Sequence, residues 1–275
     1  MSDAEPRVKI EEGVVYGVGG GRELRCDVYR PIDAVGLLPG LLLVHGGGWR
    51  RGSRAGQRGY GLRIAREGFV CVAIEYRLLG ESPWPAAIHD VKAALRFVRA
   101  RAGEHGIDPE QICIQGSSAG AHLALLAAGT PGRPRLEGDG GHAGVPTQVR
   151  AAVGIYPPTT FYVSGERASG ALPGFVLLGG EATVEAAHEA SPRSHVTPSY
   201  PPTFLIHGSA DKVVPPSSSL RMYEALAEAG VPVELKMFAN LPHGFASHPD
   251  YQRLLSREIL SFLRRSLAAP RNAAV

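Results

Sequence analysis

The pentapeptide Gly116-Ser117-Ser118-Ala119-Gly120 stands where a short apolar run, residues 111–115, gives way to an alanine- and leucine-rich run, residues 118–128. The first run predicts a buried strand and the second a helix. A serine flanked by glycine two residues before and two residues after fits a sharp turn between them, because side chains at those positions would collide. Only Ser118 has both glycines, and the pattern occurs once in the chain. The stretch therefore predicts Ser118 as a nucleophile at the end of a strand.

On both sides of this turn, short apolar runs alternate with longer amphipathic segments, which is typical of βαβ units and a mainly parallel sheet. Further strands are expected at residues 8–18, 23–29, 41–45, 69–76, 149–156, 203–207 and 233–238, the first two as an antiparallel pair. Helices are expected at residues 58–67, 85–103, 217–229 and 251–267, the third capped by Ser217, Ser218 or Ser219. Residues 130–148 are expected to form a long surface loop. We expect one α/β domain over residues 1–275, with an insertion at about residues 157–202 whose length is typical of a cap.

A second glycine-rich segment, His45-Gly46-Gly47-Gly48-Trp49, follows the strand expected at residues 41–45. A tetrahedral intermediate needs N–H donors where its negative oxygen forms, and glycines let the backbone approach that closely. Together with the serine turn, this segment predicts an oxyanion hole made of the backbone N–H groups of Gly47, Gly48 and Ala119. Gly46 is a weaker alternative donor, and His45 is expected to be a structural residue at the base of the loop.

A serine hydroxyl needs a base, and the base needs a carboxylate that orients it. In the fold that carries the serine turn, the chain order is serine, acid, histidine. The histidines well downstream of Ser118 are His195, His207, His243 and His248. His243 lies in a loop after the last expected strand, with His248 as its nearest rival, whereas His207 ends the strand at residues 203–207 and is expected to pack under the loop. Asp211 follows that strand. Asp250 lies after His243 and is in the wrong order. The sequence thus predicts a catalytic triad of Ser118, Asp211 and His243.

The chain resembles the alpha/beta hydrolase-3 and hormone-sensitive-lipase-like carboxylesterases, and especially the small bacterial carboxylesterase and feruloyl-esterase-like group. The resemblance rests on the oxyanion loop, the serine turn, both triad loops and the segment Glu75-Tyr76-Arg77-Leu78, where the family usually has aspartate in place of Glu75. It implies the α/β-hydrolase fold and hydrolysis of small to medium acyl esters through an acyl-enzyme, without metal or cofactor. The His-Gly-Gly-x-Trp form of the loop is also similar to kynurenine formamidases, which leaves N-formyl amide hydrolysis open. A ligand-binding protein that has lost catalysis is the alternative from another class.

The composition gives no sign of a nucleic-acid partner, because the 29 basic and 26 acidic residues leave a net charge of only +3. A local group of arginines around the glycine-rich loop is expected to form a solvated face rather than an acid-binding patch: Arg50, Arg51, Arg54, Arg58 and Arg63. The three cysteines are widely spaced and predict buried thiols rather than disulfides. No membrane span and no secretory signal are visible, so we expect a cytoplasmic enzyme whose partner is a small ester. Homodimer formation stays open.

Overall fold

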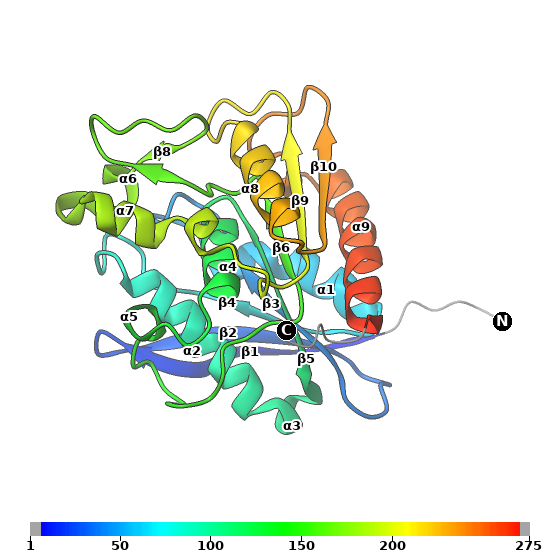
Figure 1. Ribbon diagram of the computed structural model, residues 1–275. Helices are drawn as coiled ribbons and strands as arrows, with labels where there is room; N and C mark the ends of the chain where they lie inside the picture. The colour runs from blue at the N-terminus through cyan, green and yellow to red at the C-terminus, as the bar shows by residue number, and fades with distance from the viewer. Residues whose placement is uncertain (1–6, 270–275) are drawn as a thin grey trace.

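An eight-stranded sheet, in the order β1-β2-β4-β3-β5-β6-β9-β10, runs through the computed structural model, which describes residues 7–269 (Figure 1). The strands are β1 (Val8–Gly19), β2 (Arg22–Pro31), β3 (Leu38–Val44), β4 (Val70–Ile74), β5 (Ile107–Ser117), β6 (Ala152–Ile155), β9 (Thr203–Gly208) and β10 (Val233–Phe238). The β1–β2 and β2–β4 pairs are antiparallel, and all other neighbours are parallel. The carboxyl ends of β5, β6, β9 and β10 therefore meet at one edge of the sheet.

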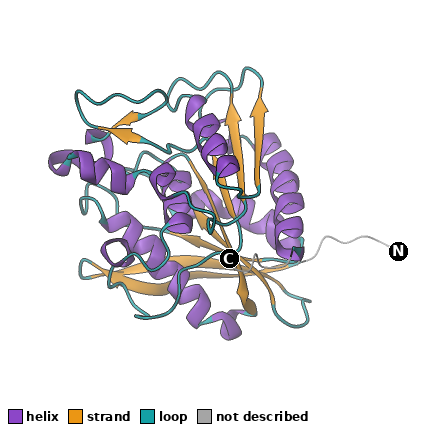
Figure 2. Ribbon diagram, in the orientation of Figure 1, coloured by secondary structure: helices purple, strands orange, loops and turns teal. Residues whose placement is uncertain are grey.

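The side chains of β3 alternate between two cores, one on each face of the sheet, and explain why its sequence is apolar throughout. Leu41 and Leu43 face α1 (Arg58–Arg66) and α9 (Pro249–Ala268). Leu42 and Val44 face the other side, which is covered by α2 (Ala86–Ala100), α4 (Ala119–Gly129) and α8 (Ser217–Glu228). Figure 2 shows the helices flanking the sheet in this way. The mainly parallel α/β architecture expected from the alternating pattern is confirmed.

The segment between β6 and β9, residues 157–202, forms an insert on one side of the molecule, at upper left in Figure 1. It contains β7 (Phe161–Tyr162), β8 (Leu172–Pro173), α6 (Phe175–Leu178) and α7 (Val184–Ala190). Phe161 and Leu177 are buried in the core shared with α4, whereas Phe175 is 66% exposed. The buried apolar residues of the insert thus anchor it to the core of the domain.

Three local predictions were wrong. The expected loop at residues 130–148 contains a short helix, α5 (Pro134–Glu137), because Glu137 forms ion pairs with Lys92 and Arg96 of α2. The helix expected at residues 85–103 is divided into α2 and α3 (Ala102–His105). The N-cap of α8 is Pro216, with no side-chain cap, because Ser218 and Ser219 bond to groups outside the helix.

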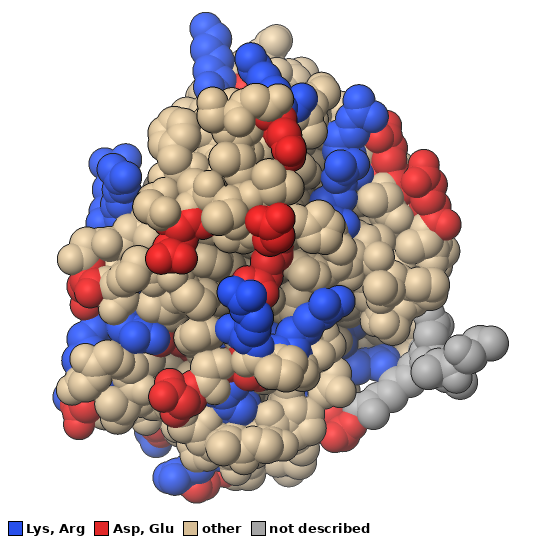
Figure 3. All heavy atoms as spheres, turned by 60° about the vertical axis from the view of Figure 1, so that its left-hand side comes forward, with Lys and Arg blue, Asp and Glu red and all other residues tan. Residues whose placement is uncertain are grey.

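The three cysteines are buried and free, as the spacing predicted. In the described residues, 7–269, no helix has the length and hydropathy to cross a bilayer. Figure 3 shows lysines and arginines interspersed with acidic residues on one face of the molecule. The two ends of the single domain that we expected, residues 1–6 and 270–275, lie outside the described residues.

Candidate active site

Ser118 occupies a strained turn between β5 and α4, with a φ of 53° and a ψ of −121°. A Cβ at Gly116 would lie 2.2 Å from the carbonyl oxygen of Gly120, and a Cβ at Gly120 would lie 2.3 Å from that of Val44. Both contacts are impossible, so the two glycines are required by the close approach of β5, α4 and β3. The turn holds the serine at the sheet edge, where strain of this kind is typical of functional residues.

A continuous hydrogen-bond chain leads away from Ser118. Its Oγ lies 2.9 Å from Nε2 of His243, and Nδ1 of His243 lies 2.6 Å from Oδ2 of Asp211. Asp211 follows β9, His243 follows β10, and Ser118 follows β5, so three strand ends bring together residues up to 125 positions apart. The Asp211 carboxylate is fully buried, and its Oδ1 accepts the backbone N–H groups of Val213 and Val214. The structure thus brings together the three residues predicted as a triad.

The rival residues lie elsewhere. His248 accepts the backbone N–H of Asp250 at the start of α9, and both side chains are largely exposed. His195 is buried and bonds to the carbonyl of Glu189 in the insert. Neither alternative histidine contacts Ser118 in the hydrogen bonds of the described residues.

The predicted oxyanion loop lies directly against the serine turn. A Cβ at Gly46 would lie 2.7 Å from the carbonyl oxygen of Ser117 and 3.4 Å from Cβ of Ser118. Gly47 and Gly48 have φ values of +123° and +61°, which glycine adopts without strain. Ala119 is the first residue of α4, so its N–H has no partner within the helix. The loop and the helix start therefore flank Ser118, as the predicted donors require.

His45 is buried at the base of this loop, as expected for a structural residue. Its ring stacks on Tyr76 at a centroid distance of 4.3 Å, and the Tyr76 hydroxyl donates to the carbonyl of His45 at 3.0 Å. Burial lowers the pKa of His45, so the ring is neutral. Tyr76 follows β4, and it thereby ties the oxyanion loop to the neighbouring strand.

The sequence reasoning missed His122, which lies one turn after Ser118 on α4. The indole N–H of Trp49 donates to its Nδ1 at 3.1 Å, and its Nε2 lies 2.8 Å from the carbonyl oxygen of Ala190 at the end of α7. Burial lowers the pKa of His122 to about 4, so the ring is neutral, with Nδ1 accepting and Nε2–H donating. One buried ring therefore connects the oxyanion loop, the helix after the nucleophile and the insert.

Tyr156 was also missed. It follows β6 with a φ of 41°, and its ring centroid lies 4.6 Å from that of His243. Burial raises the pKa of its phenol. A tyrosine at the end of an apolar strand reads as core, so only its position beside Ser118 at the sheet edge could have drawn attention to it.

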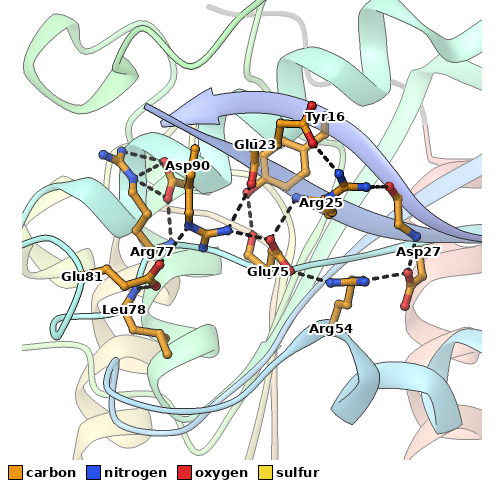
Figure 4. Close-up of polar contacts among 12 residues, drawn as sticks. Tyr16, Glu23, Arg25, Asp27, Arg54, Glu75, Arg77, Leu78, Glu81 and Asp90 are labelled. Carbon is orange, nitrogen blue, oxygen red and sulfur yellow. Dashed lines mark hydrogen bonds and ion pairs between the residues drawn. The ribbon is translucent and has the colours of Figure 1, made fainter. Parts of the chain in front are cut away.

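The expectation of a solvated arginine face was wrong for Arg54. Its Nε lies 2.8 Å from Oδ1 of Asp27, and its guanidinium also bonds to Glu75, which accepts from Arg22 on its other oxygen (Figure 4). Arg77, two positions after Glu75, forms an ion pair with buried Asp90. Glu75, where the resembling family has aspartate, thus joins the β1–β2 hairpin to the segment before α1 and has a structural role.

A family model called BD-FAE matches residues 26–226 of the chain, which include Ser118 and Asp211. The chain belongs to the BD-FAE family. Among its relatives, the probable carboxylic ester hydrolase LipM of Mycobacterium tuberculosis is 35% identical over 240 residues, which are 83% of this chain and 53% of LipM. Esterase LipC of the same organism is 37% identical over 224 residues, 78% of this chain and 54% of LipC. This BD-FAE chain spans about half the length of the curated relatives it matches.

Solved structures agree over nearly the whole length. The thermophilic esterase Est2 of Thermogutta terrifontis with propionate bound has a TM-score of 0.77 and 29% identity, covering 96% of this chain and 93% of that chain. A truncated carbohydrate esterase from gut microbiota has a TM-score of 0.84 at 24% identity, covers 98% of this chain and 99% of that one, and shows the fold alone. The α/β-hydrolase fold and the esterase resemblance expected for this BD-FAE chain are confirmed.

Proposed function

We propose that the protein is a serine carboxylesterase that hydrolyses small to medium acyl esters through an acyl-enzyme intermediate. The observation that carries this proposal is the unbroken chain of hydrogen bonds from Ser118 Oγ through His243 to the buried carboxylate of Asp211. This arrangement of nucleophile, base and orienting acid is what acyl transfer by serine requires. A structural cluster of the same residues would have no need of the strained turn at Ser118.

In the proposed reaction, Ser118 Oγ attacks the ester carbonyl carbon while Nε2 of His243 takes its proton. Asp211 holds the imidazole in the tautomer that carries hydrogen on Nδ1. The backbone N–H groups of Gly47, Gly48 and Ala119 donate hydrogen bonds to the negative oxygen of the tetrahedral intermediate. The alcohol then leaves with the proton of His243, and water attacks the acyl-enzyme in a second round. None of these steps calls on a metal or a cofactor.

Among small to medium acyl esters, those with the shorter acyl groups are expected to be the best substrates. Est2 of Thermogutta terrifontis, at 29% and 28% identity, has been solved with propionate and with butyrate bound. The insert, residues 157–202, joins β6 to β9, and β6 ends beside Ser118, whose N–H donates to the carbonyl of Ile155; this is where a cap would cover a substrate. A panel of p-nitrophenyl esters from C2 to C12, run beside N-formylkynurenine and an acetylated sugar, tests this. A maximum at C2 to C4 supports the proposal, and a preference for the formamide would replace it with the formamidase alternative.

Labelling with a fluorophosphonate probe separates the enzyme from a binding protein that has lost catalysis. Est2 of Thermogutta terrifontis has been solved phosphorylated by paraoxon. We expect the probe to label Ser118, and ester turnover to fall in proportion to the fraction of protein that is labelled. A protein that binds esters but resists the probe would contradict the proposal.

A further inference from the structure

A second histidine contacts the buried acid of the proposed triad. His207 ends β9, four positions before Asp211, and is fully buried. Its Nε2 lies 3.2 Å from Oδ2 of Asp211 and 3.1 Å from the carbonyl oxygen of Val214, while its Nδ1 lies 2.7 Å from the hydroxyl of Ser219 on α8. The sequence placed His207 under the loop, which is confirmed, but gave no reason to connect it with the acid.

The partners of His207 fix where its hydrogen lies. A carbonyl oxygen only accepts hydrogen bonds, so Nε2 must carry the hydrogen that it donates to Val214. Oδ2 of Asp211 lies 3.2 Å from the same nitrogen. Nδ1 then has a free lone pair, which accepts a hydrogen bond from the hydroxyl group of Ser219. Burial lowers the pKa of His207, which agrees with a neutral ring in this single tautomer.

We propose that His207 is a positioning residue for the reaction, whose Nε2–H donates to Oδ2 of Asp211 and holds the carboxylate in the orientation that His243 needs. This inference rests on the proposed function. Oδ2 is the same oxygen that accepts from Nδ1 of His243, while Oδ1 is held by the backbone N–H groups of Val213 and Val214. Three N–H groups thus donate to the buried carboxylate, and Nε2 of His207, 3.2 Å from Oδ2, is in reach as the fourth. A buried anion needs such donors to stay charged.

The titratable groups packed against His207 come from three elements. Asp211 lies on the loop that directly follows β9, and His243 lies on the loop after β10. Tyr156 follows β6, and its ring centroid lies 6.4 Å from that of His207. The α8 side contributes the neutral hydroxyl of Ser219. Asp211 is thus the acidic group nearest to the ring of His207, and its Oδ2 lies 3.2 Å from Nε2.

The donor at Nε2 has a consequence for the pH profile. Without it, the negative charge on Oδ2 is shared with His243 alone, which favours the protonated imidazole of His243. The acid limb of the kcat/KM profile then moves to higher pH, because less of the enzyme has a neutral base. The carboxylate also loses one of the contacts that fix its rotation, so the rate at the plateau falls.

Two matched variants separate this role from packing. The side-chain nitrogen of glutamine reaches the position of histidine Nε2, whereas that of asparagine reaches only the position of Nδ1. We expect His207→Gln to keep the wild-type pH profile with at most a few-fold loss of kcat/KM on p-nitrophenyl acetate. We expect His207→Asn to lose kcat/KM roughly ten- to a hundredfold, as for a hydrogen bond to a charged group, and to shift the acid limb upward. Equal losses in both variants, or a wild-type profile in His207→Asn, would overturn the proposal.

A measurement on the unmodified protein can overturn the proposal even where His207→Asn does not fold. In 15N-histidine spectra, we expect the ring of His207 to keep its hydrogen on Nε2 from pH 5 to pH 9, and His207→Gln to identify its signals. A hydrogen on Nδ1, or a charged ring at pH 7, would overturn the proposal. Fluorophosphonate labelling of Ser118 in the same sample distinguishes this outcome from failure of the esterase proposal itself.

Discussion

The two sides of Ser118 are built by different means. On the acid–base side, hydrogen bonds run from side chain to side chain, from Ser118 through His243 to Asp211, and Nε2 of His207 lies 3.2 Å from the same carboxylate. On the oxyanion side, the parts nearest Ser118 are backbone: Gly46 lies against the turn, and the loop is held from outside by Tyr76 and His122. The acid–base side can therefore be identified from its residue types. The oxyanion side depends instead on the close approach of the loop backbone to the Ser118 turn, which only glycine permits. We therefore expect substitutions on the two sides of Ser118 to impair the enzyme in different ways.

The largest effect is expected from Ser118→Ala, which removes the group that both sides serve. Turnover of p-nitrophenyl acetate should fall by at least about 10⁴-fold, because the base then has nothing to activate. The melting temperature should not fall, since the substitution removes one hydrogen bond from a strained turn. Full turnover in the variant would show that neither the acid–base side nor the oxyanion side of Ser118 takes part in the reaction.

Gly46→Ala tests the oxyanion side by adding a single methyl group. The added Cβ would lie 2.7 Å from the carbonyl oxygen of Ser117, so the loop must move away from Ser118. We expect kcat/KM to fall roughly 10²–10³-fold, as for the loss of one oxyanion donor. Gly56→Ala is the matched control, because a Cβ there meets nothing within 4 Å. Equal rates in the two variants would mean that close approach at Gly46 is unimportant.

The pH dependence of stability tests the support of the loop. The pKa of His122 falls from 6.5 to about 4 on folding, so between these values the unfolded chain binds a proton that the folded protein does not. His122 therefore lowers stability progressively as the pH falls from 6.5 toward 4, by roughly 3 kcal/mol in total. In urea unfolding at several pH values, His122→Gln should lose less stability over this range than the wild type. Exposed His248→Gln is the control, and parallel curves for all three proteins would contradict the assignment.

The smallest effect is expected from Tyr76→Phe, which removes only the hydroxyl that donates to the carbonyl of His45. The ring stacking on His45 remains, so the cost should be about 1 kcal/mol of stability, as for one hydrogen bond. Thermal unfolding and kcat/KM measure it, with the more exposed Tyr223→Phe as reference. A loss of activity as large as that of Gly46→Ala would mean that the strand, rather than the glycines, determines the geometry of the loop.

Much of the fold followed from the sequence because the buried parallel strands are apolar on both faces. The run Leu41 to Val44 reads as one strand, and the structure divides its side chains between two cores. The turn at Ser118 was predictable for a local reason, since its two glycines are within two residues of it. The short helix α5 was not, because it depends on ion pairs between Glu137 and two residues more than forty positions earlier.

The supporting residues of the site were hidden for the same reason. His122 and Tyr156 lie in apolar segments and read as core, and their roles depend on Trp49, Ala190 and His243 from other parts of the chain. Arg54 was misjudged because its partners, Asp27 and Glu75, come from strands that only the folded sheet brings beside it. A local motif identifies the nucleophile. The residues that support the loops around it come from distant parts of the chain, and only the order of the strands in the sheet brings them together.

The bond between His122 and the insert ends on a backbone carbonyl, that of Ala190, and not on a side chain. Any amino acid at position 190 offers the same oxygen, provided that the chain follows the same path there. The insert is therefore free to vary in sequence while its route past α4 is constrained. For protein engineering, a foreign insert grafted between β6 and β9 must bring a carbonyl to this point, or the graft will leave the imidazole N–H of His122 buried without an acceptor.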